Sequence, residues 1–579
     1  MKMLKKVLGF ALAFCMLFSV TACTPKGDDA YSETVLRVGV WDGGLGHVWI
    51  EKVAAEFEKK YADVSFEEGK TGVKVLLAPS KDNAGKISTA IDMNQNAEDV
   101  YFTCYYTGTE YVLQNRSLNI TDAVTQKVYL DNGELADMEW DAATGKLKLK
   151  AGATEPTKSI ADKMTENSRD GYYTSTEKLG NREGYAAGYY ALPFENSLSG
   201  FIYDYDLFKS HGWLNYDGID GLPGTMTDFW DLLKRIKEAG IIPFTFSRAT
   251  SEYWSGLSDA FLAQYEGHEN AELDYKLSGT YTFPAGTYTQ AECADDEYLT
   301  YNPDGTATGR ITQDSGYLLA RTPGKAKFVE FIRTLFSSDY YDPDIYTSLY
   351  DENYKLPAQR FILNSTLGQT PIAMLYEGEW WENENRSQFN YTTEGFGKHD
   401  YRFFPLPKID GQKTDQYTIA DYSRGVDLFV NAKTKKAEVA KLFLQFVHSE
   451  SSLETFTLET GITRMYEYDL SAEQQSTLSK FAQNTYKIKK TNTSGVTVTA
   501  SRAKLVADPF WSVLSMGYGG SVASRAQDAR PENQPCYFFS ENTGKDGRDY
   551  VSAETFIEGM KTVYGKKNWT DKLNEWKNK

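Results

Sequence analysis

The chain has 579 residues, and 62 Lys and Arg against 80 Asp and Glu give it a formal net charge of −18. An apolar content of 41% excludes a disordered chain, and the acidic balance argues against nucleic acid as a partner, because phosphate binding needs a basic surface. The 40 Tyr and 11 Trp are typical of surfaces that bind amphipathic ligands, since both rings combine an apolar face with a polar atom.

The first 23 residues have the pattern of an export signal. Three lysines precede an apolar run over 7–20, which is too short to span a bilayer as a helix. The segment 20–23 (VTAC) resembles a bacterial lipobox, in which the cysteine is lipidated and becomes the new N-terminus. We therefore predict a signal peptide over 1–22, lipidation of Cys23 and a polar tether over 23–34. The alternative is an ordinary cleavage region with an incidental cysteine.

The segment that follows alternates between strands and helices. Apolar runs predict strands over 35–40, 73–77 and 99–102, and apolar residues at helical spacing predict a helix between the first two. This order is the signature of a parallel sheet covered by helices. Residues 103–190 are less regular, and 141–150 have the pattern of a small hairpin.

A second group of elements follows this irregular stretch. A strand is predicted to resume over 199–204. A helix is predicted over 228–239 because its apolar residues recur at i, i+3, i+4 and i+7, with Thr225 or Thr227 as the N-cap. Residues 266–323 are rich in Tyr, Thr and Gly and contain turn signals, so we interpret them as an inserted β-rich segment.

The motifs of common enzymes and metal sites are absent from the sequence. The five His are far apart, no Gly-x-Ser-x-Gly motif occurs, and 69–71 (GKT) lacks the first glycine of a phosphate loop. We therefore expect no metal and no cofactor. Four glutamates lie around Trp380 and Trp381, and paired carboxylates beside tryptophan are what a glycosidase needs; the other interpretation is a solvated surface. These are Glu377, Glu379, Glu382 and Glu384.

Several motifs occur in the order typical of one family, the extracellular solute-binding proteins (family 1 type) of bacterial carbohydrate ABC importers, which this chain resembles. The resemblance rests on the strand and turn 35–42, on 190–193 (YALP), 200–212 (GFIYDYDLFKSHG), 223–229 (PGTMTDF), 373–380 (AMLYEGEW) and 425–431 (GVDLFVN), and on the helix 437–449 followed by 460–461 (TG). One departure is Arg464, where many members have proline.

The resemblance implies an α/β fold of the two-lobed, periplasmic-binding-protein-like type (type II). Each lobe is an open α/β sheet, and hinge strands join the lobes. The predicted division is a first lobe over 35–198 with an insertion at about 103–190, a second lobe over 199–422 with a β-rich insertion at about 266–323, a return to the first lobe over 423–460, and a C-terminal segment over 461–579 that belongs mostly to the second lobe.

Members of the family bind their ligand between the lobes. A sugar needs flat aromatic rings for its C–H faces and fixed hydrogen-bond partners for its hydroxyls, and ligands of open α/β sheets bind beyond the carboxyl ends of strands. The candidate ligand-binding residues are Trp41, Asp42, Tyr105, Tyr106, Asn196, Ser197, Glu252, Tyr253, Trp254, Glu377, Trp380 and Arg424. Trp380 is the first choice as stacking platform, and its neighbour Trp381 is expected in the core. For each candidate the alternative is a structural role.

The resemblance implies a protein that captures an oligosaccharide by hinge closure and delivers it to the permease subunits of an ABC importer, without chemistry. We expect a monomer, held at the extracellular face of the membrane by the lipid on Cys23, with no nucleic-acid partner. Three alternatives stay open. They are a secreted glycan-active enzyme using Glu377, Glu379 or Glu382, an importer component for a non-sugar solute, and a surface adhesion module.

Overall fold

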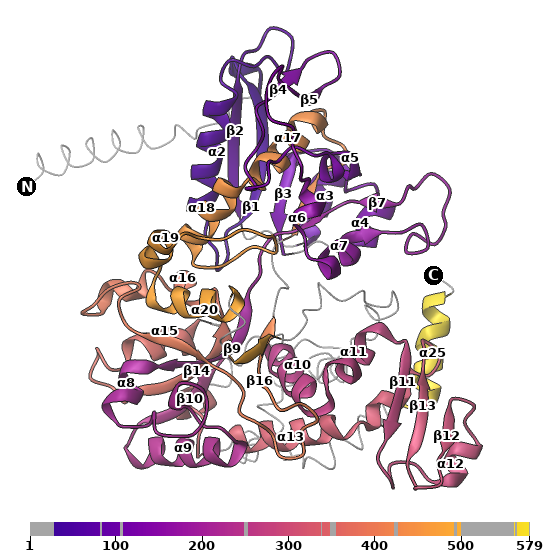
Figure 1. The fold of residues 1–579 in the computed structure, drawn as a ribbon, viewed down its shortest axis with the longest axis vertical. Coiled ribbons are helices and arrows are strands. Elements are labelled where there is room, and N and C mark those ends of the chain that lie inside the picture. Colours follow the sequence, from indigo (N-terminus) through magenta and orange to yellow (C-terminus); the bar gives the residue numbers. More distant parts are fainter. Residues whose placement is uncertain are drawn as a thin grey trace, which may run out of the picture.

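The chain forms two lobes, one above the other in Figure 1. The computed structural model describes residues 28–80, 84–104, 108–247, 253–336, 339–347, 355–421, 427–490, 495–498, 561 and 564–577. The predicted signal peptide and Cys23 lie outside these residues. No helix within the described ranges has the length and apolar character needed to cross a membrane.

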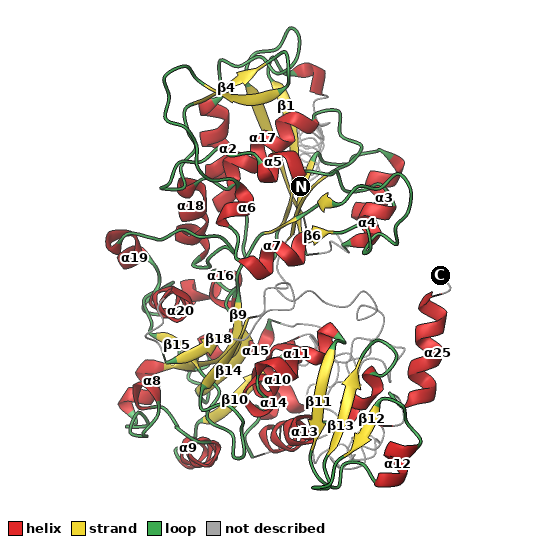
Figure 2. Ribbon diagram, turned by 45° about the vertical axis from the view of Figure 1, so that its right-hand side comes forward, coloured by secondary structure: helices red, strands yellow, loops and turns green. Residues whose placement is uncertain are grey.

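A five-stranded sheet forms the centre of the first lobe (Figure 2). Strand β1 (Thr34–Trp41) runs parallel to β2 (Val73–Ser80) and to β3 (Val100–Thr103), as the strand, helix, strand order predicted. Two antiparallel strands, β17 (Asp427–Val430) and β8 (Leu192–Pro193), complete the sheet next to β3. Distant parts of the chain therefore share this sheet.

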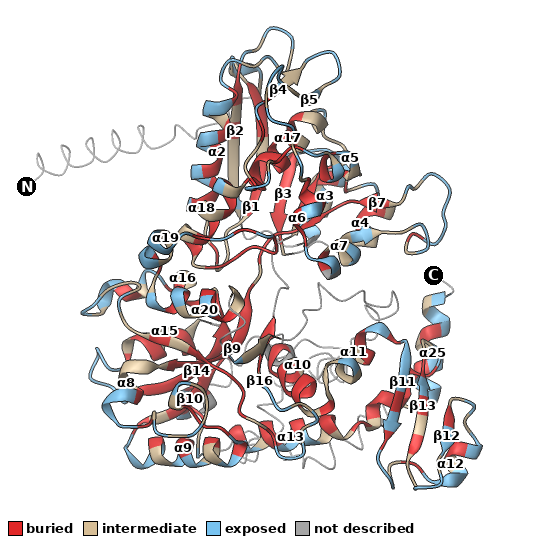
Figure 3. Ribbon diagram, viewed as in Figure 1, coloured by how far each residue is buried: buried red, intermediate tan, exposed pale blue. Residues whose placement is uncertain are grey.

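Helices cover the first-lobe sheet and form its core. On one face, α2 (Val48–Lys60) packs beside α18 (Glu450–Thr460). Trp49 of α2 is fully buried and makes edge-to-face contacts with Phe102 of β3 and Phe456 of α18, with ring centroids 5.5 and 5.2 Å apart. In Figure 3 the strands of this sheet are largely buried, and the helices that cover it are partly exposed.

A mixed sheet forms the centre of the second lobe. Its long central strand β9 (Leu198–Asp204) pairs antiparallel with β14 (Ile372–Gly378) on one side and with β16 (Tyr417–Asp421) on the other. The remaining strands are β10 (Ile242–Phe246), which is parallel to β14, β15 (Tyr401–Phe404), which pairs with β9, and β18 (Val496–Val498), which is parallel to β16.

The N-cap of the helix predicted over 228–239 is Thr225. In the structure this helix is α9 (Met226–Glu238). The Thr225 hydroxyl accepts from the backbone N–H of Asp228 at 3.2 Å, and the Asp228 carboxylate accepts from the backbone N–H of Thr225 at 3.1 Å. This capping box settles the choice between the two threonines, because it satisfies two N–H groups of the first turn.

The segment interpreted as β-rich carries helices as well as a sheet. It begins with α11 (His268–Lys276), and its strands β11 (Gly279–Phe283), β13 (Ala307–Ile311) and β12 (Leu299–Tyr301) form a separate antiparallel sheet. The C-terminal helix α25 (Lys566–Lys577) packs on this unit (Figure 1). The predicted hairpin at 141–150 consists of β4 (Met138–Asp141) and β5 (Lys146–Leu149).

Among the described elements, the chain passes between the lobes at three places. The first crossing joins β8 to β9, and the second joins β16 to β17. The third leads from α18 in the first lobe to α20 (Lys480–Lys490), which packs on β15 of the second lobe. These crossings bring residues from three distant regions of the sequence to the boundary between the lobes.

Candidate functional site

The loop that follows β1 touches the second lobe. Trp41 ends β1, and the turn after it contains Gly43 and Gly44. A Cβ atom on Gly43 would lie 2.0 Å from Nε1 of Trp41, and one on Gly44 would lie 2.7 Å from Cβ of Trp380. Because Trp380 belongs to the second lobe, the absence of a side chain at Gly44 is what permits this contact.

Trp380 lies at the boundary between the lobes. It follows directly after β14 and the residue Glu379, is half-buried, and packs against the hydrophobic cores of both lobes. At the far end of the indole, a Cβ atom on Gly378 would lie 2.1 Å from Cη2. A glycine from each lobe therefore lies against the Trp380 side chain, one near its Cβ atom and one near its six-membered ring, and the half-buried ring stays partly accessible, as an aromatic platform needs.

Direct hydrogen bonds join the lobes beside this ring. The side-chain amide of Asn383 donates to the carbonyl oxygens of Gly44 at 3.0 Å and Leu45 at 2.7 Å. Arg386 also reaches the first lobe, where it donates to the carbonyl oxygen of Glu459 at 3.3 Å. These bonds hold the loop after β1 against the second lobe.

Asp42 supplies a carboxylate next to Trp41. Its backbone N–H donates to the carbonyl oxygen of Ser80 at the end of β2, which fixes the turn. Its Oδ1 lies 3.0 Å from Nδ1 of His47, and both side chains are more than one-third exposed. Asp42 therefore stays accessible to a hydroxyl or an amine at the edge of the loop.

A small cavity of about 90 Å³ lies beside Trp41, between the first-lobe sheet and α3 (Ala84–Met93). Tyr101 and Glu98 also line it. Burial raises the pKa of Glu98 to about 7, and its Oε2 atom has no hydrogen-bond partner among the described residues. The cavity is polar enough to receive a hydrogen-bonding group.

Three of the four glutamates around Trp380 are buried. Glu377 is buried, and its Oε1 accepts from the backbone N–H of Gly378. Glu379 is buried in an ion pair with Lys489, with Oε2 and Nζ 2.7 Å apart. Glu382 is buried as well, and its pKa is raised to about 7 by burial. A glycosidase needs two carboxylates that reach one bound sugar, and these three are each engaged in a buried contact of their own, so the arrangement gives the glycosidase interpretation no support.

The structure describes the position of some of the other predicted site residues and leaves the rest undescribed. Asn196 lies in the first crossing, where its backbone N–H donates to the carbonyl oxygen of Thr463 at 2.9 Å, and Ser197 beside it is fully buried. Trp381 is fully buried in the second-lobe core. Tyr105, Tyr106, Glu252 and Arg424 lie outside the described residues; Tyr253 and Trp254 begin α10 (Tyr253–Glu266), but their side chains lie outside the description.

The structure thus brings together Trp41, Asp42 and Trp380 from the predicted set. Sequence reasoning missed Gly44 and Asn383, which make the contact between the lobes. The Gly43–Gly44 pair was visible only as a turn that ends a strand, and nothing in the local sequence around Asn383 signals its role. Within the described ranges, no group of three His, Cys, Asp or Glu is placed to hold a metal ion.

The chain matches the profile of the family described as bacterial extracellular solute-binding protein over residues 47–452. It therefore belongs to this family, whose members bind solutes outside the cell and are not catalysts. This confirms the expectation of a non-enzymatic binding protein. A search of curated protein sequences finds no match.

Solved structures with a similar fold cover nearly the whole chain. One is a chitin oligosaccharide binding protein, with 13% identity and a TM-score of 0.52, covering 94% of this chain and 100% of that one. Another comes from a study of xylan utilization by the thermophilic bacterium Caldanaerobius polysaccharolyticus, with 12% identity and a TM-score of 0.51, covering 91% of this chain and 99% of that one. These similarities confirm the predicted α/β, periplasmic-binding-protein-like fold.

Proposed function

We propose that the protein captures an oligosaccharide between its lobes and delivers it to the permease subunits of an ABC importer. The observation that carries the proposal is the position of Trp380, a half-buried indole held at the lobe boundary by Gly44 and Gly378. A ligand that stacks on this ring also meets the first lobe. Such a ligand favours the closed arrangement, because only there does it contact both walls.

The neighbouring groups suit a sugar. Trp41 offers a second aromatic side chain, and the Asp42 carboxylate accepts hydroxyl hydrogen bonds that are stronger than neutral ones. The names of the two similar structures, for a chitin oligosaccharide and for xylan utilization, support a carbohydrate over other solutes. We include the remaining predicted residues, Tyr105, Tyr106, Asn196, Ser197, Glu252, Tyr253, Trp254, Glu377 and Arg424, in the proposed binding region.

A ligand screen by thermal unfolding tests the proposal. A solute present at about 100 times its dissociation constant stabilises the native state by about 2.7 kcal/mol, which raises the unfolding temperature of a chain of this length by about 2–3 °C. We expect such a shift with oligosaccharides of one linkage class and its loss in Trp380→Ala. Trp381→Phe is the matched control, since the adjacent ring is buried away from the boundary, and it should keep the shift. Shifts with peptides or amines only would refute the carbohydrate assignment.

The anchor is a separate part of the proposal. The apolar run over 7–20 and the VTAC segment support lipidation of Cys23, and more than one acyl chain is needed for stable attachment. Cells fed radiolabelled palmitate should label the wild-type protein and leave Cys23→Ser unlabelled. Label in both proteins would place the lipid elsewhere.

A further inference from the structure

A cluster of ion pairs fastens the N-terminal end of the described chain to the first lobe. Oδ1 of Asp28, in the short helix η1 (Asp28–Ala30), accepts from Nε and Nη2 of Arg37 at 3.1 and 2.9 Å. Its Oδ2 accepts from Nζ of Lys436 at 2.5 Å. Burial acts to raise the pKa of Asp28, but the bonds from Lys436 and Arg37 outweigh it and lower that pKa, so the carboxylate stays charged at neutral pH. We call this cluster the Asp28 clasp.

The Asp28 clasp lies at the end of the first lobe that is remote from the second lobe. Arg37 is in the first half of β1, whose carboxyl end leads into the loop that touches the second lobe. Lys436 follows β17, whose last residue pairs with the first residue of β3. The loop 431–436 and the end of α3 therefore form a surface at the amino ends of the parallel strands, which we call the outer end of the first lobe.

The outer end presents lysines and an exposed apolar side chain. The loop 431–436 contains three lysines, in a chain whose net charge is −18. Lys435 is exposed, and Nζ of Lys433 donates to the carbonyl oxygen of Asp92 in α3 at 3.0 Å. Met93, the last residue of α3, is 62% exposed. Anionic lipid headgroups attract lysines, and an apolar side chain beside them is suited to the boundary between headgroups and acyl chains.

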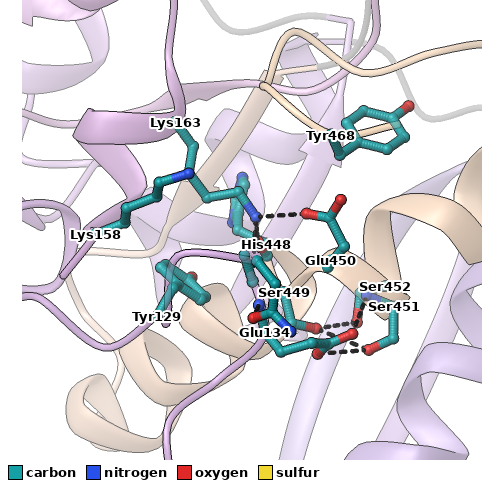
Figure 4. A network of polar contacts seen from close by, with 12 residues as sticks. Tyr129, Glu134, Lys158, Lys163, His448, Ser449, Glu450, Ser451, Ser452 and Tyr468 are labelled. Carbon is teal, nitrogen blue, oxygen red and sulfur yellow. Dashed lines mark hydrogen bonds and ion pairs between the residues drawn. The ribbon is translucent and has the colours of Figure 1, made fainter. Parts of the chain in front are cut away.

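Internal bonds brace the first lobe, so a restraint on its outer end also restrains the rest of the lobe. Figure 4 shows Lys163 against the junction between α17 (Ala437–Val447) and α18. Nζ of Lys163 donates to the carbonyl oxygen of His448 at 2.9 Å and pairs with Glu450 at 3.6 Å, and the Lys163 side chain is only 1% exposed. Because α17 begins directly after Lys436, these bonds connect the Asp28 clasp with the region around Lys163.

We propose that the outer end of the first lobe is the face that lies on the membrane, with Lys435 and Met93 at the lipid headgroups. The inference rests on the proposed lipid on Cys23 and goes beyond it, because an anchor alone does not decide which face meets the bilayer. Only residues 23–27 separate this lipid from Asp28, and five residues extend over at most about 18 Å. The short span holds the outer end at the bilayer and leaves the second lobe free to move against the first.

Lysine footprinting of the lipidated protein in vesicles of phosphatidylcholine and phosphatidylglycerol tests the proposal. The vesicles are treated with a water-soluble acetylating reagent, and the modification of Lys435 is compared by mass spectrometry with that of Lys234. Lys234 is the internal control, because its side chain is 69% exposed on α9, at the lower end of the second lobe in Figure 1. The comparison variant carries a Gly/Ser linker of about 20 residues between Gly27 and Asp28, which adds about 70 Å of reach.

We expect the ratio of Lys435 to Lys234 modification to be several-fold lower in the wild-type protein than in the linker variant. Equal ratios in the two proteins would overturn the proposal. Protein that does not sediment with the vesicles would refute the lipid anchor and, with it, the membrane-facing end. Sedimentation with equal ratios would refute the orientation alone and would leave the oligosaccharide screen unaffected.

A second variant tests the Asp28 clasp itself. In Asp28→Ala the chain is next held at Ser32, whose carbonyl oxygen accepts from the backbone N–H of Thr71 at 3.1 Å, so the span from Cys23 grows to about 30 Å. The ratio should then lie between those of the wild-type protein and the linker variant. Asp29→Ala is the matched control, because Asp29 is an exposed neighbour outside the clasp, and it should keep the wild-type ratio. An equal rise in both variants would contradict the role of the clasp.

Discussion

Gly378→Ala should displace the Trp380 ring while leaving the second lobe folded. Gly378 lies outside the left-handed backbone region, so alanine is compatible with its conformation. Its Cβ atom would lie 2.1–2.3 Å from three atoms of the six-membered ring, whereas ordinary contacts begin at 3.4 Å. The ring must therefore retreat by about 1 Å, while Gly44 of the first lobe lies close to the Cβ end of the same side chain.

The substitution has two consequences, a loss of stability and a loss of affinity for the sugar. Overpacking of this kind costs about 1–3 kcal/mol of stability, which a lobe of this size tolerates. Stacking of a sugar on one indole face buries on the order of 100 Å² of joint apolar surface, worth about 2.5 kcal/mol at about 25 cal/mol per Å². Losing it lowers the affinity about 60-fold.

Isothermal titration with the sugar identified by the screen measures this loss. Gly240→Ala is the control, since Gly240 has φ +75° and open space around it, so alanine there costs about 1 kcal/mol of backbone strain far from Trp380. We expect wild-type affinity for the control. Wild-type affinity in Gly378→Ala, or an equal loss in Gly240→Ala, would refute the role of Gly378 in positioning the Trp380 ring.

Two predictions concern stability. Trp381→Ala should lower the free energy of unfolding by about 3–5 kcal/mol, because the fully buried ring packs against Phe361, Tyr401 and Phe481; a loss below about 1 kcal/mol in urea unfolding would contradict this packing. Burial raises the pKa of Glu382 from 4.5 to about 7, so its contribution to stability is complete below pH 4.5 and is lost as the pH rises through 7. Glu382→Gln should remove about 3 kcal/mol of this pH dependence, and equal slopes of stability against pH in both proteins would show that Glu382 is not its source.

The sequence predicted what local patterns encode. The apolar run 35–40 predicted the central strand β1, and the helical spacing of apolar residues predicted α9, with Thr225 as one of two candidate N-caps. The tryptophan pair was also separable from the sequence, because adjacent residues at a strand end point in different directions. These features depend on neighbours within a few positions, so the periodicity of apolar residues and the chemistry of helix caps are enough to predict them.

Such local patterns could not predict the contacts between the lobes, because the partners in these contacts are distant in the sequence. Asn383 donates to Gly44 across 339 positions, and Lys489 donates to Asn196 across 293 positions. Neither Asn383 nor Lys489 stands in a motif that the resemblance covers. Their placement follows from the folding of both lobes and from the third crossing, and only the assembled structure defines these.

The structure gives a physical reason for the departure from the family pattern at Arg464. A proline at this position would lack the backbone N–H that donates to the Tyr468 hydroxyl at 2.8 Å, and it would lack the guanidinium that holds the carbonyl of Phe194. Arginine replaces a fixed backbone angle with a set of hydrogen bonds that reach the first crossing. The bond to Phe194 thus joins the third crossing to the first at the boundary between the lobes.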